Sequence, residues 1–346
     1  MKRRDFLKLS GVAAASALMG RFPSMAAAAQ KTGRRVDFHA HAILPSYADG
    51  LKRLGIDAAA EEGFPLPQWS AETHLQFMAD AGMDYSVLSM PTPHTYHGDA
   101  GLAREVTRRV NEDYAALCRK YPDKFGFVAA LPLPDVEGAL AEIAYATEHL
   151  GALGVKVASN SDGVYLGDPC FDSLFAELDK RGALVILHPS PARNLPREGV
   201  VTGGVMALYE YPADTTRTVV NLLANRTLEK FPRIRLVVPH CGSFLPYMKS
   251  RAGGMFRLLS AMGRMEPVDM EAGMKHLWFD LAGDPTPDQM DMLFRITDED
   301  HIVYGSDYPY VLAPIVLQRK KALDEVLAQR GQLGRFYTEN AKKLLA

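Results

Sequence analysis

Cysteine is scarce in this chain of 346 residues, and the three that occur lie far apart in the sequence. Three thiols at such spacings can form neither a disulfide framework nor a zinc site built from cysteines two residues apart. A small disulfide-stapled fold and a cysteine-based zinc module are therefore excluded. We expect three buried free thiols, at Cys118, Cys170 and Cys241.

An excess of charge of one sign is also lacking. The chain carries 39 Lys and Arg against 41 Asp and Glu, a formal net charge of -2, and it contains no long basic run. Because proteins that bind nucleic acid usually carry a basic stripe, the sequence predicts no nucleic-acid partner. With 47% hydrophobic and 23% charged residues, the composition is that of a globular chain with a sizeable core, which excludes disorder and coiled coil.

Several nucleotide-binding and hydrolytic motifs are missing as well. The sequence has no GxxxxGK phosphate loop, no GxSxG nucleophile elbow, and no GxGxxG turn after the first expected strand. Cys241 lies beside His240, but neighbouring residues of a strand point to opposite faces, which argues against a cysteine nucleophile. The sequence therefore does not indicate chemistry by a nucleotide cofactor, a serine or a cysteine.

The first thirty residues have the layout of an export signal. A basic start, an apolar stretch over 9–19 and a run of alanines ending at 29 follow one another. The apolar stretch is too short to span a bilayer, so we expect no stable membrane insertion. The segment RRDFLK at 3–8, which contains Arg3 and Arg4, resembles the twin-arginine signature of proteins exported in the folded state. We predict a signal peptide over 1–29, use of the twin-arginine translocase, a periplasmic or exported location, and one domain over 30–346; an uncleaved amphipathic anchor is the alternative.

After this segment, short apolar or β-branched runs alternate with longer amphipathic stretches. Most runs are apolar without alternation, which suits parallel strands that are buried on both faces. Eight strand and helix units predict an α/β fold, a (β/α)8 TIM barrel, and an open doubly wound sheet is the alternative. The expected strands are 35–41, 85–91, 125–132, 154–159, 183–189, 235–242, 276–283 and 301–309, and clear helical stretches are 105–121, 136–150 and 171–180.

Two connections are longer than a barrel needs. They span 43–70 after the first strand and 190–212 after the fifth strand, and both contain several prolines. Both leave from the carboxyl ends of strands, where barrel enzymes carry their sites, so we expect long functional loops there. Ser70 is a suitable N-cap for a helix that follows the first loop.

Histidine and aspartate recur at the carboxyl ends of the expected strands. His39 and His41 are two residues apart in the first strand, so both point to the same face. His188 ends the fifth strand, His240 the sixth, and Asp307 lies near the end of the eighth. Because these strand ends meet at one rim of a barrel, the side chains should converge. Nitrogen and oxygen ligands of this kind predict one divalent metal ion, zinc first and manganese as an alternative.

Other ionisable residues receive different interpretations. We expect His74 and His149 to lie on helices in contact with solvent, whereas His94 follows the second strand at the end of the barrel that carries the site and is a candidate for the substrate pocket. Lys156 in the fourth strand leaves a binuclear alternative open, because a lysine in that strand is carbamylated and bridges two metals in some metal-dependent hydrolase barrels.

Taken together, the motifs resemble the amidohydrolase superfamily, in the branch of aminocarboxymuconate-semialdehyde decarboxylase and related metal-dependent decarboxylases. The resemblance runs from Val36 to the C-terminus and depends on DFHAH at 37–41, HP at 188–189, HCGS at 240–243 and GSDYP at 305–309. The segments PQWS at 67–70, YLGDP at 165–169 and EYPADTTR at 210–217 are similar to 6-methylsalicylate decarboxylases. One departure is Cys241, because many relatives have a glycine pair after the histidine of the sixth strand.

The resemblance assigns roles to individual residues. It implies that the metal ligands are His39, His41, His188 and Asp307, and that His240 contacts the metal-bound water or the substrate carboxylate and relays protons. Arg251, eleven residues after His240, would reach the substrate of a neighbouring subunit, which implies a homodimer. Trp69, Arg217 and His94 are further candidate substrate contacts.

The implied activity is the non-oxidative decarboxylation of a small aromatic or unsaturated acid such as a hydroxybenzoate. A salicylate-like acid can chelate a metal through its carboxylate and ortho hydroxyl, an acid protonates the ring carbon, and carbon dioxide leaves without a redox cofactor. Asp307 is the expected proton donor, with His240 as alternative or partner. Two other hypotheses stay open: a metal-dependent hydrolase of an amide, ester or lactone that uses the same residues, and an exported protein that binds without turnover.

Overall fold

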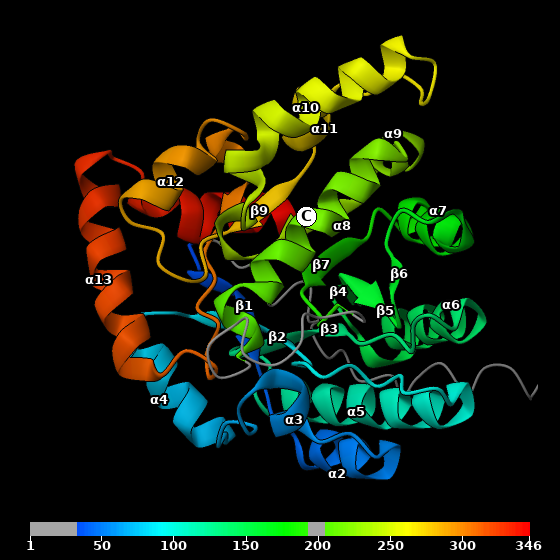
Figure 1. The fold of residues 1–346 in the computed structure, drawn as a ribbon. Helices are drawn as coiled ribbons and strands as arrows, with labels where there is room; N and C mark the ends of the chain where they lie inside the picture. Colours follow the sequence, from blue (N-terminus) through cyan, green and yellow to red (C-terminus); the bar gives the residue numbers. More distant parts are fainter. Residues whose placement is uncertain (1–32, 193–204) are drawn as a thin grey trace, which may run out of the picture.

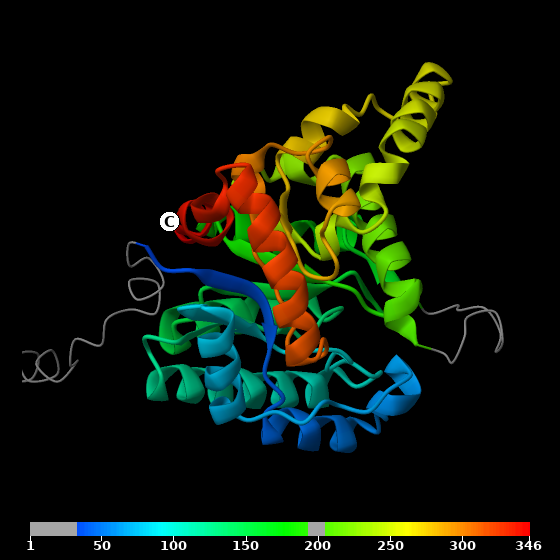
Figure 2. The ribbon, with the colours of Figure 1, turned by 90° about the vertical axis from the view of Figure 1, so that its left-hand side faces the viewer.

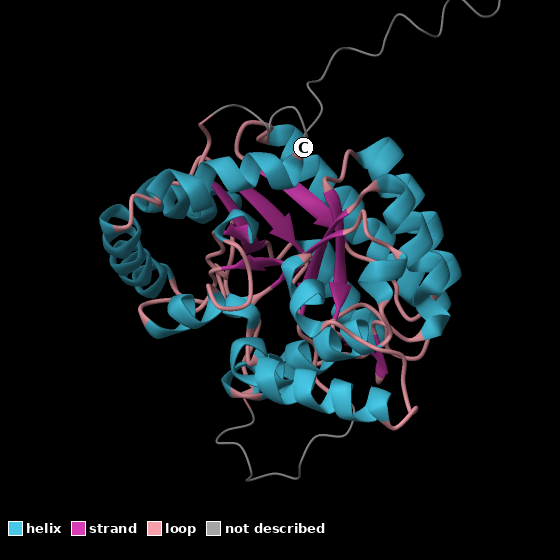
Figure 3. Ribbon diagram, turned by 90° about the horizontal axis from the view of Figure 1, so that it is seen from above, coloured by secondary structure: helices cyan, strands magenta, loops and turns pink. Residues whose placement is uncertain are grey.

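A computed structural model describes residues 33–192 and 205–346 of the chain. Eight parallel strands follow one another in chain order around a nearly closed barrel, and helices surround it (Figures 1 and 3). The predicted (β/α)8 barrel is thus confirmed. The strands are β1 (Val36–His41), β2 (Tyr85–Ser89), β3 (Phe125–Ala129), β4 (Gly154–Ala158), β7 (Leu184–His188), β8 (Arg235–Val238), β9 (Trp278–Asp280) and β10 (Ile302–Val303), with a separate hairpin of β5 (Asn160–Ser161) and β6 (Val164–Tyr165).

The barrel strands are buried along their whole length. Every residue of β1 to β4, β7, β9 and β10 is buried, which explains why the sequence of these strands is apolar without alternation. Each strand pairs with the next in parallel, and Ala158 of β4 faces His188 of β7 in this register. Parallel pairing in chain order brings all carboxyl ends to one rim, which is where the expected ligands lie.

Closure between the last and the first strand uses backbone hydrogen bonds beyond β10. The last strand is much shorter than the expected 301–309, because the chain leaves it after Val303. The amide of Phe38 donates to the carbonyl oxygen of Tyr304 at 2.9 Å, and the amide of His41 donates to that of Tyr308 at 2.8 Å. The chain after β10 therefore runs beside β1 as far as Tyr308.

The helices pack their apolar faces onto the outside of the barrel. All three helical stretches that the sequence indicated are present, as α5, as α6 with a π-helical turn after it, and as α7. The helices are α2 (Pro45–Leu54), α3 (Ala58–Glu62), α4 (Ala71–Ala81), α5 (Ala100–Lys120), α6 (Val136–Tyr145), α7 (Asp172–Arg181), α8 (Glu210–Ala224), α9 (Thr227–Lys230), α10 (Leu245–Ala261), α11 (Met270–Lys275), α12 (Asp288–Leu293), α13 (Ala313–Gln329) and α14 (Asn340–Leu345).

The two connections that the sequence predicted as long loops have different outcomes. The segment 43–70 is not a long irregular loop, because α2 and α3 occupy it, and α3 brings Glu62 into the interior. Ser70 caps α4 as predicted, with its hydroxyl accepting from the amide of Thr73 at 3.1 Å. Most of the second connection, at 193–204, and the whole predicted signal peptide lie outside the described residues.

Two predictions of burial were wrong. His74 on α4 is fully buried, because its ring packs among aromatic side chains that include Phe77 and Tyr308. Cys170 is exposed beside α7, whereas Cys118 and Cys241 are buried free thiols as expected. The solvent-exposed position of His149 agrees with the sequence.

The long helix α10 has few neighbours at its C-terminal end. Its last turns extend away from the barrel (Figure 2), and Leu258 and the following Met262 are more than half exposed. No described helix combines the length and the apolar character that a membrane crossing requires.

Candidate metal centre and active-site cavity

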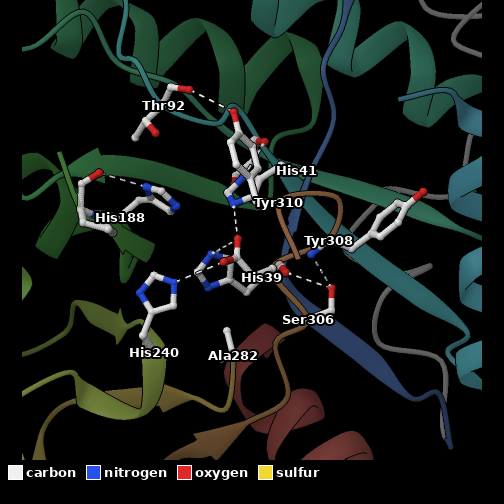
Figure 4. Close-up of polar contacts among 12 residues, drawn as sticks. His39, His41, Thr92, His188, His240, Ala282, Ser306, Tyr308 and Tyr310 are labelled. Atoms are coloured by element: carbon white, nitrogen blue, oxygen red, sulfur yellow. Dashed lines mark hydrogen bonds and ion pairs between the residues drawn. The ribbon is translucent and has the colours of Figure 1, made fainter. Parts of the chain in front are cut away.

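Four side chains converge at the rim formed by the carboxyl ends of the strands. Each offers one ligand atom, and these atoms all lie within 4.8 Å of one another. They come from three places in the barrel: the end of β1, the end of β7 and the segment after β10 (Figure 4). The structure thus brings together the four ligands that the sequence predicted, His39, His41, His188 and Asp307.

The imidazole rings are anchored through one nitrogen, which leaves the other free for a ligand. His39 donates from Nδ1 to Oδ2 of Asp280 at 2.7 Å, and His188 donates from Nδ1 to the carbonyl oxygen of Pro189 at 3.0 Å. Nδ1 of His41 lies 3.0 Å from Oγ and 3.3 Å from the carbonyl oxygen of Ser89. Such contacts orient metal-binding histidines and direct the lone pair of Nε2 towards the ion.

Two buried nitrogen atoms support this assignment. Within the described part of the chain, Nε2 of His39 and Nε2 of His41 have no hydrogen-bond partner. A buried polar atom without a partner costs free energy, and a divalent ion bound by three imidazoles and one carboxylate would satisfy both. The residues present therefore fit a single divalent metal ion.

Asp307 lies between the histidines. Its Oδ1 is 3.3 Å from Nε2 of His41 and 3.5 Å from Nε2 of His39, while its Oδ2 is 3.6 Å from Nε2 of His240. Burial acts to raise the pKa of this carboxyl, but the neighbouring imidazoles of His240, His41 and His39 outweigh it and hold the pKa below the usual range. Oδ1 of Asp307 thus faces the other predicted ligands, and Oδ2 faces His240, the predicted proton relay.

The two histidines of β1 differ in their electrostatic surroundings. Burial lowers the pKa of His41 to about 4. Burial opposes charge on His39 too, yet the charge and hydrogen bond of Asp280 raise its pKa to about 9. Asp280 is itself fully buried at the end of β9, so it is an integral part of the site.

A second buried carboxylate joins β1 to the segment after β10, and a glycine allows the two to lie close together. Oδ1 of Asp37 accepts from the amide of His39 at 3.0 Å and from the amide of Ser306 at 3.1 Å, and burial raises the pKa of Asp37 to about 7. A Cβ at Gly305 would lie only 2.6 Å from Cβ of His39. A side chain at position 305 would therefore displace a predicted metal ligand.

The backbone adopts strained conformations at the residues that carry the reactive groups. Asp307 has a φ of 60° and His240 a φ of 56°, and Cys241 and Ser243 are also left-handed. Each such non-glycine residue costs about 1–3 kcal/mol. Strain of this kind persists only where surrounding contacts fix it, and it concentrates at functional sites.

A cavity of about 580 Å³ opens above the cluster, and His188, His240 and Asp307 line its floor. Its walls combine aromatic and apolar side chains with a few hydroxyl groups, one arginine, a further carboxylate at Asp284 and an amide at Gln289. The wall residues include Phe64, Thr92, Tyr211, Phe244, Tyr247, Met292, Tyr310 and Arg319. A cavity of this size and character suits a small aromatic ligand.

The predicted substrate contacts do not line this cavity in the described protomer. Arg217 donates to Asp214 at 2.8 Å and to the hydroxyl of Tyr165 at 2.7 Å, and Nε1 of Trp69 donates to Nδ1 of His74 at 3.0 Å. His94 is largely buried beside Lys156 in a separate small void, and Arg251 is exposed on α10. Their roles towards substrate stay predictions.

The side chain of Lys156 points into the barrel; the sequence alone did not decide this direction. Its Nζ donates to the carbonyl oxygen of Met90, and burial lowers its pKa to about 7. Lys156 is thus held by a backbone carbonyl group, and the binuclear alternative stays a prediction.

Several site residues had escaped the sequence analysis. Asp280 could have been found, because a charged residue ends the apolar strand WFD. Tyr310 and Arg319 carry no such signal, since they lie on a loop and a helix whose inward face depends on the tertiary fold. Tyr211 lies in the segment EYPADTTR, but nothing in that segment singles it out. Thr92 follows β2 at the rim but has no distinctive neighbour in the sequence.

Comparison with known proteins agrees with this geometry. The Amidohydro_2 amidohydrolase family model matches residues 36–346. A decarboxylase, yanB, from Aspergillus niger is 31% identical over 293 residues, covering 81% of this chain and 78% of the relative. The 6-methylsalicylic acid decarboxylase of Penicillium expansum is 28% identical over 279 residues, covering 80% and 85%.

A solved structure described as an amidohydrolase II superposes with a TM-score of 0.80 at 34% sequence identity, covering 90% of this chain and 99% of that one. The family match covers the whole barrel, including each of the four clustered ligands and His240. The chain therefore belongs to the amidohydrolase family.

Proposed function

We propose that this protein is a metal-dependent, non-oxidative decarboxylase of a small aromatic carboxylic acid such as a hydroxybenzoate. The observation that carries the proposal is the cluster of three histidines and Asp307 at the floor of a cavity with aromatic walls. Relatives that span most of this chain are named as decarboxylases, one of them of 6-methylsalicylic acid. The substrate is accordingly a planar acid whose carboxylate is held at the floor.

The metal ion would be held by His39, His41, His188 and Asp307. A bound divalent ion would draw the carboxylate of the acid and stabilise the negative charge that develops in the reaction. Zinc is the ion we propose, because three imidazoles and one carboxylate match its preferred donor set, and manganese accepts the same donors.

Proton delivery is the task of Asp307 and His240. Both line the cavity, and Nε2 of His240 lies 3.6 Å from Oδ2 of Asp307. Their side chains are about one-fifth exposed, so a proton can reach them from solvent through the cavity. Because the pKa of Asp307 is held low, this carboxylate is ionised in the free site. We therefore assign to His240 the delivery of a proton to Oδ2 of Asp307, from which it passes to the ring carbon bearing the carboxylate.

We also propose a homodimer formed through α10. This helix extends beyond the barrel (Figure 2). Its exposed side chains include Tyr247, Met255 and Leu258, and Met262 directly after its end is exposed too, which gives an apolar surface that a second copy would cover. Tyr247 also belongs to the cavity wall, so the interface would adjoin the active site. Arg251 on the same helix would then reach the substrate carboxylate in the partner's cavity.

Finally, we propose export to the periplasm through the twin-arginine route. The support is the sequence at 3–8 and the apolar and alanine-rich stretches that follow it. A route that carries folded cargo suits an enzyme whose metal is bound before export.

Replacing a metal ligand should abolish metal retention. We expect His188→Ala to contain almost no zinc after dialysis, because the ion would lose one of its four protein donors. Elemental analysis of the purified protein measures this. The exposed His149→Ala is the matched control and should keep its metal; full occupancy in His188→Ala would remove this residue from the ligand set.

Decarboxylation can be tested with isotopes. Metal-loaded protein is incubated in heavy water with hydroxybenzoates that carry a labelled carboxyl group. We expect labelled carbon dioxide and a product with one ring deuterium, and we expect both to fall at least about 100-fold in Asp307→Asn, because a positioned acid contributes about 10²–10⁴. Turnover of esters or lactones without release of carbon dioxide would make the protein a hydrolase.

The proposed role of Arg251 across a dimer predicts complementation. Arg251→Ala should raise the Michaelis constant at least about tenfold while leaving metal content unchanged, since it removes a charged hydrogen bond to substrate. Mixed dimers of Arg251→Ala and Asp307→Asn should regain activity, because one of their two sites is intact. Arg257→Ala, also exposed on α10, is the control. Light scattering that gives a monomer would contradict the proposal.

Export should require both arginines of the signal. We expect the chain with Arg3→Lys and Arg4→Lys to accumulate unprocessed inside the cell, measured by fractionation and immunoblot. The control is Lys8→Arg, which keeps the pair. Normal export of the double lysine variant would argue against the twin-arginine route.

A further inference from the structure

A buried carboxylate on α8 lies outside the cavity and takes no part in the proposed chemistry. Asp214 is 1% exposed, and it is not among the residues that line the cavity. Its Oδ2 accepts from the hydroxyl of Ser159 and, at 2.9 Å, from Nδ2 of Asn160. Its Oδ1 accepts from the hydroxyl of Tyr165 and, at 2.8 Å, from Nη1 of Arg217. We call these five residues the Asp214 cluster.

The cluster joins the two later segments that are similar to 6-methylsalicylate decarboxylases. Tyr165 begins the segment YLGDP at 165–169, and Asp214 and Arg217 belong to EYPADTTR at 210–217. The hydroxyl of Tyr165 also accepts from Nη1 of Arg217 at 2.7 Å. The two segments thus meet at a single carboxylate.

Ser159, directly after β4, connects the cluster to a predicted metal ligand. Because its hydroxyl gives its only proton to Asp214, its oxygen is an acceptor, and the amide of Ser190 donates to it at 2.9 Å. The amide of Ser159 donates to the carbonyl oxygen of His188 at 2.9 Å. Ser159 therefore holds the backbone on both sides of Pro189.

The backbone held in this way orients the ring of His188. Nδ1 of His188 donates to the carbonyl oxygen of Pro189 at 3.0 Å, and such a contact directs the lone pair of Nε2 towards a metal ion. Nδ2 of Asn160 also lies 3.3 Å from the carbonyl oxygen of Ser190 and 3.1 Å from that of Pro191. Contacts thus continue from the carboxylate on α8 to the imidazole.

We propose that Asp214 is a positioning residue for His188, and that it acts through the hydroxyl of Ser159 on the Pro189 carbonyl group that orients the imidazole. The inference rests on the metal site of the proposed function. Asp214 touches neither the metal nor the substrate; it fixes the direction of one of the four donors. Its loss should weaken metal binding in a protein that still folds.

The test measures metal affinity separately from activity. Zinc-free protein competes with a chromophoric chelator for zinc, and the visible absorption of the cobalt-loaded protein reports the geometry of the ligands. We expect Ser159→Ala and Asp214→Ala each to weaken zinc binding at least about tenfold and to change the cobalt spectrum, because loss of a group that orients a ligand costs about 10–100-fold in metal affinity. Circular dichroism checks that each variant is folded.

A double variant shows whether the two residues act in series. Ser159→Ala combined with Asp214→Ala should bind zinc about as weakly as the weaker single variant, since the loss of Ser159 already breaks the path. Asp214→Asn should recover most of the affinity. Its amide oxygen accepts from Ser159 and Asn160, its amide nitrogen donates to the hydroxyl of Tyr165, and the half-exposed Arg217 turns to solvent.

Two matched controls separate positioning from a loss of stability. Ser86→Ala removes an equally buried hydroxyl from β2, and Glu142→Ala removes a buried carboxylate that accepts from an arginine and an asparagine on α5. Both should keep the zinc affinity of the parent. Because Ser159→Ala removes only a hydroxyl, it decides the question if Asp214→Ala does not fold.

The outcomes distinguish the inference from the proposed function. Parent affinity in folded Ser159→Ala, or a double variant whose loss is the product of the two single losses, overturns the inference while the metal site stands. A parent protein that binds neither zinc nor manganese overturns both.

Discussion

The backbone hydrogen bonds between the segment after β10 and β1 set the geometry on which the metal site depends. The amides of Ser306 and Asp307 donate to the carbonyl oxygen of His39 at 3.2 and 2.7 Å. Asp307 follows in a left-handed conformation that turns its carboxylate towards the ligands on β1. Because the same contacts close the barrel, the fold cannot form fully without bringing the first and last ligands together.

Closure also explains why the polar groups around the site are tolerated. Asp37 and Asp280 are fully buried carboxylates, and each accepts backbone amide hydrogens from segments that meet at the rim. Their hydrogen bonds offset part of the cost of burial, and His39 supplies Asp280 with a further donor. The rim is therefore a connected polar network in which the position of each ligand depends on its neighbours.

How much of this could be predicted from sequence depends on the kind of signal. The barrel followed from runs such as 183–187, and the ligand pair followed from the strand period that places His39 and His41 on one face. These are local patterns with a fixed geometry. The ends of the strands were predicted less well. Strand β10 ends six residues before the expected limit at 309, because the barrel closes there through isolated backbone hydrogen bonds and not through a regular ladder.

The remaining features depend on packing between distant segments, which a single sequence does not encode locally. Glu62 ends the stretch AAAEE, which looks like the exposed face of a short helix, yet α3 packs it into the interior. Arg217 lies in a segment that resembles the decarboxylases, but it pairs with Asp214 and Tyr165. A motif identifies a residue type at a position; the direction of its side chain depends on which partner lies nearest in the folded chain.

The floor and the walls of the cavity have different physical tasks in the proposed decarboxylation. At the floor, the metal ligands and His240 would face the carboxylate, where charge changes during the reaction, so contacts there affect the rate of the chemical step. The aromatic side chains of the walls, such as Phe64 and Tyr310, would contact the ring and orient the acid. Orientation decides whether the proton at Asp307 meets the correct carbon. The residues that orient the acid thus come largely from segments other than those that hold the metal ligands.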